Sequence, residues 1–125
     1  MAGSITVTTT RVGPLTRYDI DWLSSAGGAV SANTFSVKTG ELVEVRFTPD
    51  GGGTQPTDLY DLTMTDADGT DVLAGTGANL SNATATAVVP VISTYFRRQL
   101  TAGDLTPVIA NAGNAKGGNI VLLVR

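Results

Sequence analysis

The sequence predicts an all-β protein, namely a single compact antiparallel β-sandwich or barrel of about eight to ten short strands with at most one short helix. Two observations lead to this fold class. Short runs in which apolar and polar residues alternate recur along the chain, as expected for strands with one buried face. Clusters of Gly, Pro, Asn and Asp separate these runs, and such clusters are typical of turns between strands.

Two strands are predicted in the first quarter of the chain. Residues 4–12, SITVTTTRV, combine isoleucine and valine with threonines, and Gly13-Pro14 ends the run. Residues 15–23, LTRYDIDWL, have the cleanest period-two pattern in the chain. Its apolar face consists of Tyr18, Ile20 and Trp22, and its polar face of Arg17, Asp19 and Asp21. We expect the apolar face to enter the core and the polar face to be wet and salt-linked.

The sequence pattern in the middle of the chain predicts two further strands and a loop. A weak strand is expected either through Val30 or at residues 35–37, and a stronger one at residues 41–48, ELVEVRFT. In the stronger strand the inward residues are expected to be Val43, Val45 and Phe47. Residues 49–57, PDGGGTQPT, hold three consecutive glycines between two prolines. This composition predicts a flexible loop within the domain.

The second half of the chain continues the β pattern. A strand is expected at residues 59–65, with Val72 and Leu73 beginning its return. Pro90 makes residues 84–92, TATAVVPVI, an edge strand or a strand end. The only plausible helical turn covers residues 93–100. Two strands close the fold, at 105–110 and 119–124, and the second, NIVLLV, has the continuous apolar run of a central strand.

Length and composition restrict the classes of protein to which the chain can belong. Its 125 residues suit one domain, residues 1–125, with residues 1–12 available as an extended N-terminal strand. Only 15% of the residues are charged and the net charge is −3, which disfavours nucleic acid as a partner. No apolar run is long enough to span a membrane. The first residues, MAGSITVTTT, lack the pattern of a signal peptide, so we expect synthesis in the cytoplasm unless a signal-independent route exports the protein.

The residue inventory disfavours catalysis. The chain has no histidine and no cysteine, which excludes Ser-His-Asp and Cys-His centres and the usual zinc sites. Asp19 and Asp21 share the polar side of one strand and are a formal candidate for a glycosidase pair. Arg17 lies beside them, so a salt-linked surface is the better interpretation. We therefore expect no enzymatic activity and no cofactor.

An acidic stretch at residues 58–75, DLYDLTMTDADGTDVLAG, raises the question of a cation site. If Asp66 begins an EF-hand loop, Asp71 occupies the glycine position and Gly77 the position of the bidentate glutamate. The stretch therefore fails as an EF-hand. A looser site from Asp66, Asp68 and Asp71 remains open. A β-hairpin that turns at Asp68-Gly69 fits the pattern better.

Aromatic residues give two candidates for partner contacts. Tyr95, Phe96, Arg97 and Arg98 combine aromatic rings with guanidinium groups, the composition of interface hot spots. The alternative is that the two aromatic residues close one end of the core. Trp22 is the only tryptophan. It is a formal platform for a carbohydrate ligand, but its place on an apolar strand face favours a core role.

Three segments carry a resemblance to known proteins: FSVKTGELVEVRFTP at residues 35–49, GGTQPTDLYDLTMTDADGTDVLAGTGANLSNAT at residues 52–84 and GNAKGGNIVLLVR at residues 113–125. Together they resemble small structural proteins of tailed bacteriophages. The resemblance spans most of the chain from about Phe35 onward but includes no site motif, so it assigns no binding residues.

The resemblance implies a virion component without catalytic activity. The first role that it implies is a capsid decoration (cement) protein that binds the major capsid protein and stabilises the head shell. A neck or tail accessory protein is the alternative, and a carbohydrate- or cell-surface-binding β module is an alternative of another class. We expect a homo-oligomer, either a trimer or a ring. The strand at residues 4–12 is the candidate for pairing with a neighbouring subunit.

Overall fold

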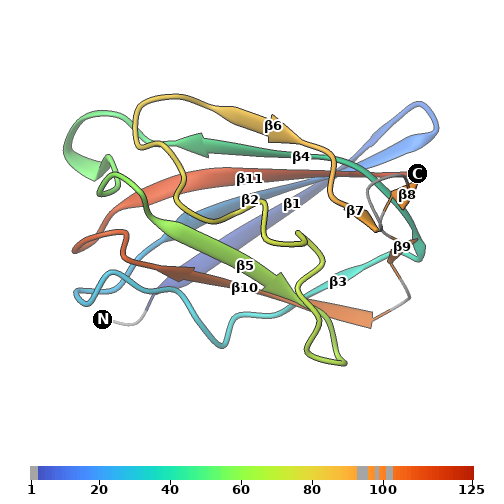
Figure 1. Ribbon diagram of the computed structural model, residues 1–125, viewed down its shortest axis with the longest axis horizontal. Coiled ribbons are helices and arrows are strands. Elements are labelled where there is room, and N and C mark those ends of the chain that lie inside the picture. Colours follow the sequence, from blue (N-terminus) through green and yellow to red (C-terminus); the bar gives the residue numbers. More distant parts are fainter. Residues whose placement is uncertain (1–2, 93–95, 98, 101–102) are drawn as a thin grey trace.

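The computed structural model describes residues 3–92, 96–97, 99–100 and 103–125. Eight strands form two antiparallel sheets that pack face to face as a β-sandwich (Figure 1). Within the described residues the only helical element is the 3₁₀ turn η1 (Gly52–Thr54). The all-β prediction is therefore confirmed, and of its two architectures the sandwich is the one that forms.

The larger sheet has the strand order β1-β2-β11-β4-β6. Its strands are β1 (Ser4–Val12), β2 (Leu15–Leu23), β11 (Gly117–Val124), β4 (Gly40–Pro49) and β6 (Thr86–Val88). The predicted strands at residues 4–12 and 15–23 form with the same bounds. β11 lies between β2 and β4, so the prediction of a central final strand is confirmed. β6 is an edge strand that ends just before Val89-Pro90, as the proline predicts.

The smaller sheet has the order β3-β10-β5. Its strands are β3 (Phe35–Val37), β10 (Gly103–Ala110) and β5 (Asp61–Thr65). Short strands complete the described fold: β7 (Val91–Ile92) pairs with β8 (Phe96–Arg97), and β9 (Gln99–Leu100) pairs with the first residues of β4.

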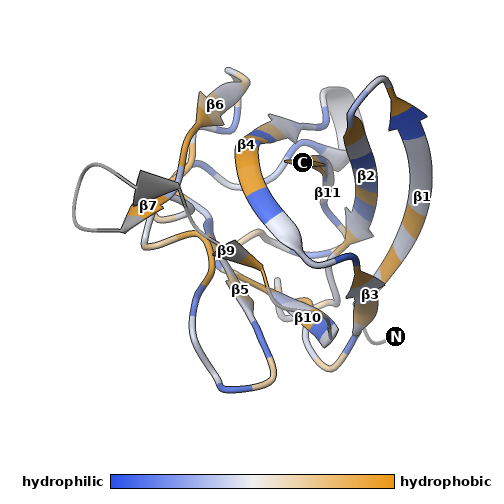
Figure 2. Cartoon of the chain, turned by 90° about the vertical axis from the view of Figure 1, so that its right-hand side faces the viewer, coloured by the Kyte–Doolittle hydropathy of each residue, from blue (hydrophilic) through white to orange (hydrophobic). Residues whose placement is uncertain are grey.

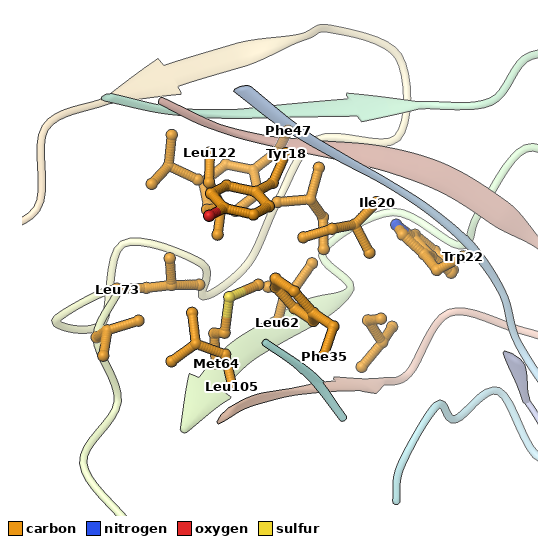
Figure 3. Close-up of a cluster of buried hydrophobic side chains, with 14 of the residues drawn as sticks. Tyr18, Ile20, Trp22, Phe35, Phe47, Leu62, Met64, Leu73, Leu105 and Leu122 are labelled. Carbon is orange, nitrogen blue, oxygen red and sulfur yellow. The ribbon is translucent and has the colours of Figure 1, made fainter. Parts of the chain in front are cut away.

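The core fills the space between the two sheets (Figure 3). The predicted face of β2 points into it, because Tyr18, Ile20 and Trp22 are all buried. The ring of Tyr18 lies 6.2 Å from that of Phe35, and the ring of Trp22 lies 5.6 Å from that of Tyr60. Residues of the other strands complete the core, among them Phe47, Leu62, Met64, Leu105 and Leu122. Aromatic pairs at such distances add specific geometry to the burial of apolar area.

A β-bulge corrects the predicted inward face of β4. Leu123 pairs with Glu44 and Val124 pairs with Leu42, so Val43 is an extra residue in the ladder. An inserted residue shifts the alternation by one position. As a result Leu42 is fully buried where Val43 was expected, whereas Val45 and Phe47 point inward as predicted.

Two further expectations are corrected in the second half of the chain. In the predicted helical turn at residues 93–100, the described residues Phe96–Arg97 and Gln99–Leu100 form strands. Val72 and Leu73 are buried but begin no returning strand. The return is limited to one bridge between Thr65 and Asp71, after which the chain enters turns.

The glycine-rich loop at residues 49–57 is attached to its neighbours by four hydrogen bonds. The Asp50 N–H donates to the carbonyl of Gly117 at 3.1 Å. The Thr57 N–H donates to the carbonyl of Ala112 at 2.9 Å. The Gln55 side-chain amide donates to the carbonyl of Asn82 at 2.9 Å, and Lys116 Nζ donates to the carbonyl of Gly53 at 3.0 Å. The flexibility of the loop stays a prediction, and these contacts place it over the turn that precedes β11.

Candidate functional site

Half of the predicted interface cluster lies outside the residues that the structure describes. The backbone of Phe96–Arg97 forms β8, which pairs with β7. Tyr95 and Arg98 lie outside the residues that the structure describes. The role of Tyr95, Phe96, Arg97 and Arg98 in partner contacts therefore stays a prediction.

The aspartates of the acidic stretch act as acceptors for backbone N–H groups. One carboxylate oxygen of Asp71 accepts from the N–H groups of Met64 at 3.0 Å and Leu73 at 3.1 Å. Its other oxygen accepts from the N–H of Gly75 at 3.1 Å. The carboxylate thus holds the loop after β5 against that strand. Charge-assisted bonds of this kind are stronger than neutral ones.

Asp58 and Asp61 hold the far end of the same loop. The carboxylate of Asp58 accepts from the N–H of Asn82 at 3.1 Å. That of Asp61 accepts from the N–H of Asn79 at 2.9 Å and from the side-chain amide of Asn111 at 2.8 Å. These bonds lower the pKa of Asp61, because they stabilise its charged form.

The predicted turn at Asp68-Gly69 is present. Gly69 has a φ of +82°, and its N–H donates to the carbonyl of Asp66 at 3.0 Å. A carboxylate oxygen of Asp66 accepts from the N–H groups of Asp68 and Thr70, both at 3.0 Å. Two of the three aspartates of the looser cation candidate, Asp66 and Asp71, thus bind backbone amides. Among the described residues no group of three acidic side chains is placed to hold a metal ion.

Trp22 does not offer a stacking platform. Its side chain is only 3% exposed and packs against Tyr60 inside the sandwich. The core interpretation of this residue is confirmed. The carbohydrate-binding alternative loses the residue that suggested it.

The outer face of the larger sheet carries two ion pairs on either side of β11. Arg17 and Asp19 on β2 are joined at 2.9 Å, and Arg46 and Glu44 on β4 at 2.8 Å. The salt-linked surface predicted for β2 is therefore confirmed. Between the two pairs, Val121 on β11 lies opposite both Asp19 and Arg46. It is only 4% exposed, so surrounding side chains cover this apolar residue.

Burial and like charge perturb two groups at one end of the sandwich. Burial raises the pKa of Tyr60 to about 12, and the negative charge of Asp50 adds to the shift. The pKa of Asp21 is also raised, first by burial and then by Asp50. Both shifts favour neutral side chains in the folded state.

Three of the four sheet edges are short or covered. β3 and β6 have three residues each. The outer edge of β5 is occupied by the loop that follows it. The N–H of Leu62 donates to the carbonyl of Gly77 at 2.7 Å, and the N–H of Val72 donates to the carbonyl of Met64 at 2.8 Å. These are the devices by which proteins prevent unwanted strand pairing.

The fourth edge, β1, is long and exposed. Its nine residues pair without interruption with β2, and it lies outermost at one side of the larger sheet (Figure 2). Six of its last seven residues are exposed. The strand contains one charged residue, Arg11, and no proline. β1 is therefore the best candidate for a functional surface, and we call it the β1 edge.

The tight turn at Gly13-Pro14 lets β1 pair with β2 up to its last residue. Val12 pairs with Leu15, so the turn has two residues. Gly13 has a φ of +58°, the sign that a type II′ turn requires at its first central position, and proline fits the second. Such turns match the twist of the flanking strands. In Figure 1 the tip of this hairpin projects at the upper right of the sandwich.

No protein-family model matches this chain, and a comparison with curated proteins finds no significant relative. The described part of the chain encloses no ligand-sized pocket. It also contains no helix with the length and apolar character needed to cross a bilayer.

Proposed function

We propose that this chain is a non-enzymatic structural protein of a tailed-bacteriophage virion. In this proposal it decorates the head, binds the major capsid protein and stabilises the shell. The resemblance of residues 35–125 to small phage structural proteins supports the class. The structural observation that supports it most is the β1 edge, because a virion component works as part of an assembly, and a long open strand on a rigid sandwich can pair with a neighbouring subunit through main-chain hydrogen bonds.

The behaviour of the acidic residues is consistent with this role. Asp61, Asp66 and Asp71 are engaged in holding backbone. Arg17 and Asp19 neutralise each other on the sheet surface. The carboxylates of the acidic stretch therefore stabilise the fold.

The test uses particles of the bacteriophage that encodes the chain. Mass spectrometry of homogeneous particles should detect the protein, and a density map should place the sandwich on the outside of the head. Particles that lack the protein should release DNA at a lower temperature than complete ones. Density at the neck or tail would overturn the head assignment. Absence of the chain from the particles would overturn the virion role.

A further inference from the structure

The β1 edge carries backbone N–H and C=O groups that make no hydrogen bond to the described residues. The two-residue turn makes Val12 and Leu15 a hydrogen-bonded pair, and such pairs alternate along an antiparallel ladder. The even-numbered residues of β1 therefore bond to β2. The N–H and C=O groups of Ile5, Val7, Thr9 and Arg11 point to the open side.

One contact is consistent with this direction and lies just before β1. The carbonyl of Gly3, an odd-numbered residue, accepts from the side-chain amide of Asn33 at 3.2 Å. The open edge therefore begins after Gly3. No such contact reaches the outward groups from Ile5 to Arg11 within the part of the chain that the structure describes.

The sequence of β1 is compatible with pairing to itself. Pairing of two copies in antiparallel orientation along all nine residues sets Ser4 opposite Val12 and centres the pair on Thr8. Residues whose backbone groups point to the open side then lie opposite each other, for example Val7 opposite Thr9. Thr6 lies opposite Thr10, and the side chains of this second pair are on the solvent face of the sheet. Threonine pairs across strands are favourable.

Charge also permits this arrangement. Arg11 is the only charged residue of β1. In the full-length register it faces Ile5 of the other copy, so the two arginines are well separated. Like charges directly opposite each other would destabilise the pair. Because a two-fold pairing is closed, it uses up the open edge and does not continue into a fibre.

We propose that two copies of this protein pair through their β1 strands, antiparallel and centred on Thr8. This two-fold dimer is the homo-oligomer that we propose in place of the trimer or ring expected from the resemblance. The two larger sheets then join into one continuous sheet across the dimer. Four outward-facing residues of each copy, Ile5, Val7, Thr9 and Arg11, supply the main-chain hydrogen bonds. This inference does not depend on the virion role, since it concerns the purified chain alone.

The first test removes one outward N–H group. Thr9→Pro deletes the donor that faces Val7 of the other copy, and its matched control Thr9→Ala shortens the side chain but keeps the donor. Light scattering coupled to size exclusion should show a dimer for the original chain and for Thr9→Ala. Thr9→Pro should be a monomer, with a Kd raised at least about tenfold. A monomeric original chain, or a dimeric Thr9→Pro protein, would overturn the proposal.

The second test reads the register and does not rely on proline. In the double variant Thr6→Lys/Thr10→Glu, each lysine faces a glutamate of the other copy, twice per dimer. In Thr6→Lys/Thr10→Lys, lysines face lysines at the same places. Both positions are exposed and lie on the solvent face of the sheet. The first variant should dimerise at least about tenfold more tightly than the second, and the gap should shrink in high salt. Equal affinities would exclude this register.

Discussion

At the scale of single residues, the aspartates replace secondary structure in an irregular segment. The loop after β5 has no continuous ladder partner, so its N–H groups need other acceptors. Asp71 alone accepts two of them, from Leu73 and Gly75, and also the N–H of Met64 in β5. A buried N–H group without a partner costs about 1–3 kcal/mol. The carboxylate therefore stabilises both the loop and the edge of β5.

Asp71→Ala is expected to destabilise the protein by about 3 kcal/mol, because several N–H groups lose their acceptor at once. The free energy of unfolding from urea titration measures this effect. Asp68→Ala is the matched control, since Asp68 is exposed at the tip of the same turn. It should change stability by no more than about 0.5 kcal/mol. Equal losses in the two variants would contradict the role given to Asp71.

Tyr60 makes stability depend on alkaline pH. Its folded-state pKa is raised from 10.0 to about 12, so the folded state favours the neutral phenol. The resulting stabilisation is complete below pH 10 and is lost as the pH rises towards 12. A shift of this size corresponds to roughly 3 kcal/mol. The difference in unfolding free energy between the original chain and Tyr60→Phe should change by about 2 kcal/mol between pH 9 and pH 12, because Tyr60 is only half ionised in the folded state at pH 12. A constant difference would show that Tyr60 ionises freely in the folded state.

At the scale of elements, the two sheets treat their edges differently. β5 is closed by the loop that Asp71 and Gly77 hold against it, whereas β1 stays open along its length. The bulge at Val43 shows a similar local control, because one extra residue lets β4 bury Leu42 and then Val45. The loop decides which backbone groups of β5 face water, and the bulge decides which side chains of β4 enter the core.

Gly77→Ala should damage the closed edge of β5. A methyl group at this position would overlap the carbonyl oxygen of Leu62, which belongs to the backbone and cannot move aside easily. We expect a loss of about 2–3 kcal/mol in unfolding free energy, from strain and from displacement of the loop. Gly53→Ala is the control, because the space around Gly53 is open. Thermal melting of the two variants compares them, and equal melting temperatures would contradict this packing.

At the scale of the whole molecule, one core joins both sheets. Trp22 from β2 meets Tyr60 from the segment before β5, and Tyr18 from β2 meets Phe35 from β3. Contacts that link separate sheets couple their stability. The chain should therefore unfold as one cooperative unit.

The single tryptophan allows a direct test of this unity. Trp22 fluorescence reports the packing between the sheets, and far-UV circular dichroism reports the strands. The two signals should give the same melting temperature and the same van't Hoff enthalpy. Emission of the folded protein should lie at short wavelength, since Trp22 is 3% exposed. Two separate transitions would show that the sheets fold independently.

Much of this architecture was predictable because alternation is a strong local signal. β1 and β2 have the predicted bounds, since Gly13-Pro14 marks their turn in the sequence. The bulge at Val43 was not predictable, because nothing in ELVEVRFT distinguishes an inserted residue from a regular one. The helical turn expected at residues 93–100 rested on local propensity, which pairing with β4 and β7 overrides.

The candidate site was predictable only in part. The sequence made residues 4–12 a candidate for strand addition, which stays a prediction, but it did not show that the other edges are short or covered. That result depends on carboxylate and glycine contacts between separate segments, such as Asp61 with Asn79 and Gly77 with Leu62. Local patterns carry no record of such long-range contacts.

The central position of β11 has a consequence for the timing of folding. β2 and β4 meet only through this strand, which follows them by more than 60 residues in the chain. We therefore expect the larger sheet to remain incomplete during synthesis until residues 117–124 are free to pair. Folding that depends on such distant pairing is slow. A nascent chain arrested before Gly117 should therefore remain sensitive to protease, and release of β11 should act as the trigger that completes the sheet.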